Sequence, residues 1–170
     1  MTRYAQVVHE EWIAAPVETV RAQFADLDHH VRRNVHPALR FEVLERRVDG
    51  TRFVQEVRLL GLKQRDVFER SVTSDGGLLD TSVEGFNRGG SLRFRFTGER
   101  REDRPGTTVQ ITIRLPLPPV VGPLLKPLLE SRVRKEVRAA ALQDKADIEQ
   151  LGYPDRGSAP AARAALPAGA

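Results

Sequence analysis

The strongest constraint on the fold is a long amphipathic segment near the end of the chain, at residues 126–151. Its apolar side chains recur at three- to four-residue steps, or multiples of them, which places them on one face of a helix: Leu129, Val133, Val137, Ala141 and Ile148. The uninterrupted part, residues 130–150, predicts a helix about 30 Å long at a rise of about 1.5 Å per residue. A helix of this length needs an equally long apolar partner, and the sequence before it predicts strands.

Alternating side chains and turn residues predict seven strands, joined mostly by tight turns, with two short helices after the first strand. The helices are expected to begin at Pro16 and at His29, because proline suits the first helical position and Pro37 stops the second helix. Arg104, Pro105 and Gly106 are expected to form the last hairpin turn. The strands are expected at 7–13, 41–49, 53–59, 63–74, 78–84, 92–96 and 109–115.

Five prolines between residues 116 and 127 predict an extended connection into the long helix, which should begin near Pro127. This connection is apolar, with Leu117, Val120 and Leu124 among its residues. It is expected to pack under the long helix. The alternative is a mobile lid or a membrane-touching element that admits an apolar ligand.

Length and composition predict one domain at residues 1–153 and a disordered Ala/Pro-rich tail at 154–170. The chain has no cysteine, which excludes disulfides and thiolate metal sites. No apolar run reaches the roughly 20 residues that span a bilayer, so a cytoplasmic protein is expected. The net charge is +4, but basic and acidic residues alternate instead of forming blocks, and a nucleic-acid partner is therefore not expected.

The element order resembles the START/Bet v 1-like (SRPBCC) superfamily, and within it the bacterial polyketide cyclase/dehydrase-like or coenzyme Q-binding branch. The resemblance covers about residues 3–152, and its residues are Ile13–Pro16 with Val20, Phe24, Ala25 and Asp26, then Gly106–Val109, a proline-rich entry, and Lys145, Ile148 and Glu149. It implies an α+β helix-grip fold, in which a seven-stranded curved antiparallel sheet surrounds the C-terminal helix. It also implies a hydrophobic cavity between the sheet and this helix, and members of the superfamily include lipid carriers, receptors and cyclases.

This implied cavity predicts a ligand-binding site for a lipid, a quinone or a polyketide-like ring. Gln55 shares a strand face with apolar residues and is a candidate hydrogen-bonding partner for the polar end of such a ligand. No cofactor is expected, transient membrane contact is possible, and the oligomeric state is left open. The predicted ligand-binding residues are Phe41, Phe53, Gln55, Val57, Phe68, Phe94, Phe96, Ile111, Val133 and Val137.

His9 and Glu11 are the candidate catalytic residues, because the register set by Ile13 turns both toward the cavity. Alternatively, the strand is rotated so that Trp12 lies inside, or His9 only satisfies a buried partner. No metal site is expected, since these two residues need a third ligand and the fold would have to bring His36 or Asp66 to them.

The leading functional hypothesis is therefore binding or transport of an apolar small molecule. One alternative is a cyclase or dehydratase that uses His9 and Glu11. The other is a protein-interaction module without a ligand, in which Arg93, Arg95 and Arg114 on the outer face of the sheet contact a partner.

Overall fold

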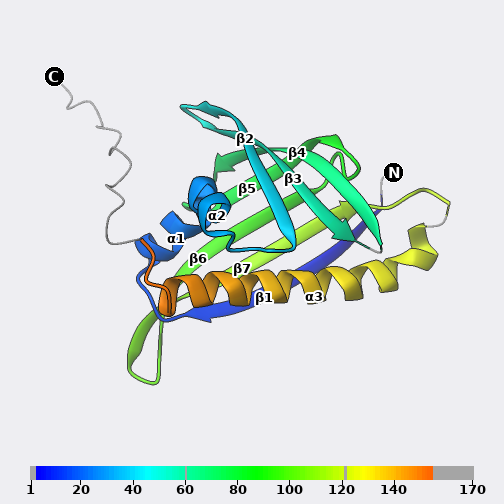
Figure 1. The fold of residues 1–170 in the computed structure, drawn as a ribbon. Helices are drawn as coiled ribbons and strands as arrows, with labels where there is room; N and C mark the ends of the chain where they lie inside the picture. The colour runs from blue at the N-terminus through cyan, green and yellow to red at the C-terminus, as the bar shows by residue number, and fades with distance from the viewer. Residues whose placement is uncertain (1–2, 60, 121, 155–170) are drawn as a thin grey trace.

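A curved seven-stranded sheet partly surrounds one long helix in the computed structural model, which describes residues 3–59, 61–120 and 122–154 (Figure 1). Two short helices, α1 (Val17–Ala25) and α2 (Leu27–Arg33), follow the first strand, and α3 (Gly122–Glu149) ends the fold. The strands are β1 (Tyr4–Ile13), β2 (Leu39–Arg47), β3 (Gly50–Leu59), β4 (Leu62–Val72), β5 (Leu78–Gly85), β6 (Ser91–Arg101) and β7 (Arg104–Pro116). The expected disordered tail falls outside the described residues, apart from Pro154.

All neighbouring strands are antiparallel, and their order is β1-β7-β6-β5-β4-β3-β2. Strands β2 to β7 form a continuous meander, and β1 returns to pair with the last of them. One face of this sheet is apolar and needs cover, which α1 and α3 provide. The predicted α+β helix-grip fold is confirmed.

Helix α3 begins at Gly122, about one turn earlier than the prolines predicted, and Pro127 lies inside it. Proline lacks the N–H that would bond to the carbonyl of Pro123, so the helix loses one hydrogen bond near its start. This first part is open to solvent, with Leu124 84% and Leu128 57% exposed. In the connection before it, Leu117 is buried beside Gly122 at the start of the helix, whereas Val120 is exposed.

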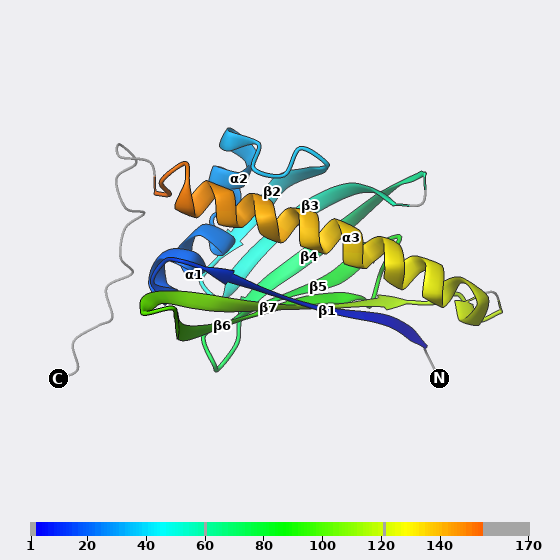
Figure 2. The ribbon, with the colours of Figure 1, turned by 90° about the horizontal axis from the view of Figure 1, so that it is seen from below.

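Helix α3 runs along β1 and covers the free edge of that strand (Figure 2). Three of its side chains bond to backbone groups of β1 or of the residue after it. Glu130 accepts the N–H of Gln6 at 3.0 Å, Lys145 donates to the carbonyl of Trp12 at 2.5 Å, and Glu149 accepts the N–H of Ala14 at 2.6 Å. An edge strand paired in this way is a poor template for another chain.

The turn between β6 and β7 lies two residues before the predicted Arg104–Pro105–Gly106. Glu102 and Asp103 form it, with φ of 50° and 61°, as the two-residue turns that suit twisted hairpins require. Gly106 is instead part of β7, where a Cβ atom would collide with the ring of Trp12. Its role is to let the indole of β1 lie directly on the backbone of the neighbouring strand.

No helix among the described residues is long and apolar enough to cross a membrane.

Candidate functional site

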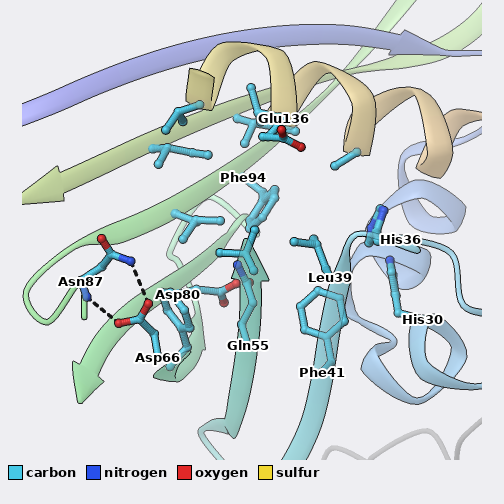
Figure 3. Close-up of a pocket in the computed structure, with 18 of the residues that line it drawn as sticks. His30, His36, Leu39, Phe41, Gln55, Asp66, Asp80, Asn87, Phe94 and Glu136 are labelled. Atoms are coloured by element: carbon cyan, nitrogen blue, oxygen red, sulfur yellow. Dashed lines mark hydrogen bonds between the residues drawn. The ribbon is translucent and has the colours of Figure 1, made fainter. Parts of the chain in front are cut away.

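A pocket lies between the concave face of the sheet and α3, reached by side chains of β2 to β7, all three helices and the α2–β2 connection (Figure 3). Its volume is about 160 Å³, counted as the space open to the centre of a water-sized sphere. One ordered water needs roughly 10–15 Å³ by the same measure, so the pocket is much larger than a packing defect. The interior between sheet and helix is not filled by the protein's own side chains.

Most of the predicted ligand-binding residues lie in the wall of this pocket: Phe41, Gln55, Val57, Phe68, Phe94, Ile111, Val133 and Val137. Two others pack in the core beside it. Phe53 is buried under Leu27 and stacks on Phe68 with ring centres 5.7 Å apart. Phe96 packs edge-on against Phe24 of α1 at 5.6 Å. Both rings face the interior of the sheet, as alternation predicts, but α1 and α2 cover them.

Gln55 projects from β3 into the pocket beside apolar neighbours. Within the described part of the chain its side-chain amide has no hydrogen-bond partner. A free amide donates two hydrogen bonds and accepts two, so this side chain is available to a bound molecule.

An ion pair lies in the pocket wall near Gln55. Arg70 of β4 donates from Nε and Nη2 to the two carboxylate oxygens of Asp80 of β5, each at 2.7 Å, and from Nη1 to the carbonyl of Phe24 at 2.8 Å. Both side chains are largely buried, and the guanidinium also lies 5.3 Å from the ring centre of Phe53. The Asp80 carboxylate and the face of the Phe53 ring both hold the guanidinium, so this part of the pocket wall has a fixed geometry.

A second polar group occupies the opposite end of the pocket from α2 (Figure 3). Asp66 of β4 is buried and accepts the backbone N–H of Asn87 at 2.6 Å and its side-chain Nδ2 at 2.8 Å. The same Nδ2 donates to Gln64 at 3.0 Å. The glycine-rich loop at 85–90 therefore closes this end of the pocket, since its Asn87 is tied to β4.

The α2 end of the pocket carries a buried cluster of imidazole and carboxylate groups. His30 from α2 and His36 from the α2–β2 connection point to the same oxygen of Asp144 on α3, with Nε2–Oδ1 separations of 3.1 and 3.2 Å. All three residues are less than a tenth exposed and line the pocket. The ligand-type atoms of His30, His36 and Asp144 lie within 4.8 Å of one another.

A neighbouring pair extends the cluster away from the pocket. His29 Nε2 lies 2.7 Å from Asp147 Oδ2, one helical turn beyond Asp144. Gln23 of α1 joins the two carboxylates by donating from Nε2 to Asp144 at 3.0 Å and to Asp147 at 3.1 Å. The two short helices are thus fastened to the end of α3 by buried polar contacts.

Charges and hydrogen bonds within the cluster shift the pKa values of Asp144 and His36. Burial alone would raise the pKa of Asp144, but the charge and hydrogen bonds of His36 and His30 outweigh burial and lower this pKa. Burial likewise opposes charge on His36, yet the facing Asp144, with the amide of Gln143 and the charge of Asp147, raises the pKa of His36. This site therefore favours a negative carboxylate and positive charge beside it.

The candidate catalytic pair, His9 and Glu11, is outside the pocket wall. Both side chains share a strand face with the buried Val7 and Ile13, as the predicted register requires, and His9 Nε2 lies 3.7 Å from Glu11 Oε2. Neither residue is part of the pocket lining, because α3 runs along β1. The third ligands considered for this pair, His36 and Asp66, line the pocket instead.

The sequence contains a signal for the cluster that the prediction did not use. The apolar stripe of α3 runs through Val133, Val137, Ala141 and Ile148, and the position missing from its period is Asp144. An acidic residue on a core-facing position is costly unless it is paired, so it indicates a buried partner. Nothing in the local pattern identifies His30 of α2 or His36 of the connection after it as the partners, since both are more than 100 residues away.

Fold and site together define a helix-grip protein with an internal pocket between sheet and C-terminal helix. The chain belongs to the family described as polyketide cyclase / dehydrase and lipid transport, whose model matches residues 4–149. With this family match, the predicted resemblance to the START/Bet v 1-like (SRPBCC) superfamily is confirmed. A search of curated proteins finds no match.

Solved structures with the same fold include TTHA0849 from Thermus thermophilus, at 22% identity and a TM-score of 0.72, covering 84% of this chain and 96% of that one. The Zhui aromatase/cyclase from Streptomyces sp. R1128 is 16% identical with a TM-score of 0.69, covering 88% and 99% of the two chains. Ginseng major latex-like protein 151 from Panax ginseng is also 16% identical, with a TM-score of 0.58 and coverage of 89% and 99%. At these identities the likeness shows the fold alone.

Proposed function

We propose that this protein binds a small, largely apolar molecule with at least one polar group in the pocket between the sheet and α3. A lipid, a quinone or a polyketide-like ring has this character. The observation that carries the proposal is an unfilled, mostly apolar pocket that contains a free amide, that of Gln55. An apolar wall with a few fixed polar groups is the usual composition of a small-molecule site.

The apolar wall supplies the affinity in this proposal and the polar groups orient the ligand. Each Å² of apolar surface removed from water contributes about 25 cal/mol, so a ligand that fills the space beside Phe41, Phe94 and Val137 gains several kcal/mol. Asp66 and Asp80 already have protein partners, which leaves Gln55 as the readiest hydrogen-bonding group for the ligand.

The two alternatives are less well supported. The position of His9 and Glu11 outside the pocket lining argues against a cyclase or dehydratase that uses this pair. A catalytic role with other residues is favoured by one observation, the two imidazoles of His30 and His36 in the pocket wall. It predicts that His36→Gln removes turnover of a bound ligand without removing its binding. A ligand-free interaction module does not account for the unfilled pocket.

Two neighbouring alanines of α3 provide a matched test of ligand binding. Ala140 lines the pocket, whereas Ala139 is exposed on the other side of the helix. Ala140→Phe should fill part of the space and abolish stabilisation by apolar compounds in a thermal-shift screen of lipids and quinones. Ala139→Phe should bind them as the unmodified protein does.

Native mass spectrometry of the protein purified from its own host gives an independent measurement, with a bound apolar species expected. The proposal is wrong if no such species is found and no compound of the screen stabilises the unmodified protein. Equal binding by the Ala140→Phe and Ala139→Phe proteins would place the ligand elsewhere.

A further inference from the structure

We propose that His30, His36 and Asp144 bind a divalent transition-metal ion in the wall of the pocket. The three side chains come from α2, from the connection after it and from α3, and all three are buried and line the pocket. The inference goes beyond ligand binding and does not depend on it, because the geometry of the three ligand atoms carries it.

The spacing of the three atoms fits one ion. Metal–nitrogen and metal–oxygen bonds of Zn²⁺ are about 2.0–2.2 Å, so adjacent ligand atoms are about 3.3–3.6 Å apart around a tetrahedral ion and about 2.8–3.1 Å apart around an octahedral one. The Nε2 atoms of His30 and His36 lie 3.1 and 3.2 Å from Asp144 Oδ1. One ligand atom from each of the three residues lies within 4.8 Å of the other two, so the set is compact enough to surround a single ion.

The other nitrogen of each ring is already held in the way that metal ligands require. His30 Nδ1 lies 2.7 Å from the backbone carbonyl of Asp26, and His36 Nδ1 lies 3.0 Å from the amide oxygen of Gln143. Both of these oxygens only accept, so each Nδ1 carries the proton. Hydrogen bonding of this kind fixes the ring orientation of metal-binding histidines and leaves the Nε2 lone pair for the ion.

The charge of the cluster is also suited to a divalent ion. A divalent ion places positive charge beside the buried Asp144 carboxylate, at the point where both rings converge on it. Gln23 Nε2 donates at 3.0 Å to the same Asp144 Oδ1 that faces both rings, so three groups fix the position of this oxygen.

The ligand set indicates which class of ion binds and that the bound ion is accessible from the pocket. Two imidazoles and one carboxylate, without sulfur, suit Zn²⁺, Fe²⁺, Co²⁺ or Ni²⁺ more than Mg²⁺ or Ca²⁺. Three protein ligands leave at least one coordination position open. Because His30, His36 and Asp144 line the pocket, that position faces whatever the pocket contains, and an oxygen atom of a bound molecule can complete the coordination.

The first experiment uses the full chain without a histidine tag, treated with a chelator and then titrated with Co²⁺ or Zn²⁺. We expect one ion per chain by calorimetry, and visible absorption from bound Co²⁺. X-ray absorption of the Zn²⁺-loaded protein should show two imidazole ligands. This measurement needs no variant, so a folding defect does not affect it. Absence of stoichiometric binding, or a ligand shell without two imidazoles, overturns the proposal.

Variants at two buried carboxylates of α3 then locate the ion. Asp144→Asn should weaken Co²⁺ binding by about 100-fold or more, since changes at residues that only hold the metal ligands in place already cost about 10- to 100-fold. Asp147→Asn removes an equally buried carboxylate that also pairs with a histidine and with Gln23, and it should weaken binding by about tenfold at most. Equal effects of the two substitutions overturn the assignment. His9→Gln, at a half-buried histidine outside the cluster, should leave the affinity unchanged, and a loss of affinity in this variant would contradict the assignment.

Failure of this test leaves the proposed binding function intact, because the thermal-shift screen with Ala140→Phe involves no metal. Failure of that screen, in turn, leaves the metal titration unaffected.

Discussion

Arg70 and Asp80 form a two-pronged salt bridge in the wall of the pocket, with both nitrogen–oxygen distances at 2.7 Å. The two residues lie opposite each other on the adjacent strands β4 and β5. The Arg70 side chain is 10% exposed and the Asp80 side chain 4% exposed. Each buried charge is therefore stabilised by the opposite charge of its partner instead of by water.

Asp80→Asn should therefore destabilise the protein by about 3–5 kcal/mol, because it leaves the Arg70 guanidinium buried without its counter-ion. Urea denaturation measures the change in free energy of unfolding. The double substitution Arg70→Met with Asp80→Leu should recover much of the loss, since it removes both charges. Glu84→Gln, which breaks the exposed pair with Arg52, should change stability by less than about 1 kcal/mol. An Asp80→Asn effect as small as that of Glu84→Gln would contradict the argument.

Gln55→Met should reduce ligand affinity selectively. The substitution keeps the volume and removes the free amide, so a quinone should bind about fivefold more weakly, since one hydrogen bond contributes about 1 kcal/mol. The hydrocarbon of the same ring skeleton should bind as before. Calorimetric titration with both compounds measures the difference. Gln6→Met, on the exposed side of β1, is the control. Equal losses for both compounds would mean that Gln55 acts through packing alone.

Glu149 should make stability depend on pH at the end of α3. Burial acts to raise its pKa, but the N–H of Ala14 and the ammonium of Lys145 outweigh burial and lower it below 4.5. The folded state therefore binds the proton less tightly than the unfolded state. The stabilisation is present above pH 4.5 and is lost as the pH falls through the folded-state value.

Thermal melts of the unmodified protein and of Glu149→Gln between about pH 7 and about pH 3 check this expectation. The difference in melting temperature between the two should shrink below pH 4.5. A difference that stays constant over this range would show that the carboxylate contributes nothing through its charge.

Gly106→Ala should destabilise the pairing of β1 with β7. The new methyl group meets the ring of Trp12 and the carbonyl of Ile13, and such overpacking costs about 1–3 kcal/mol. Gly98→Ala in the adjacent strand is a matched control, because its Cβ would lie 3.4 Å from a Val17 methyl group and meet nothing closer. Urea denaturation of both variants should separate them, and similar stabilities would show that the indole moves aside without cost.

The fold could be predicted from the sequence because its signals are local. Strand alternation and the stripe from Leu129 to Ile148 depend on residues two to four positions apart, and one long helix with one apolar sheet has few ways to pack. The same alternation put Gln55, Val57 and Phe94 on the apolar face, where they line the pocket. The predicted start of α3 near Pro127 was wrong, because the first part of the helix is exposed and tolerates the missing N–H of Pro127.

The site was decided by the tertiary structure, for a different physical reason. Alternation tells which face of β1 carries His9 and Glu11, but not that α3 would run along this strand and leave the pocket over β2 to β7. His30 and His36 contact Asp144 only because the two short helices dock on the end of α3. Along the chain, His30 is 114 residues from Asp144 (144 − 30) and His36 is 108 residues from it (144 − 36). Contacts of this kind arise from the closure of the whole sheet, and no spacing within a segment encodes them.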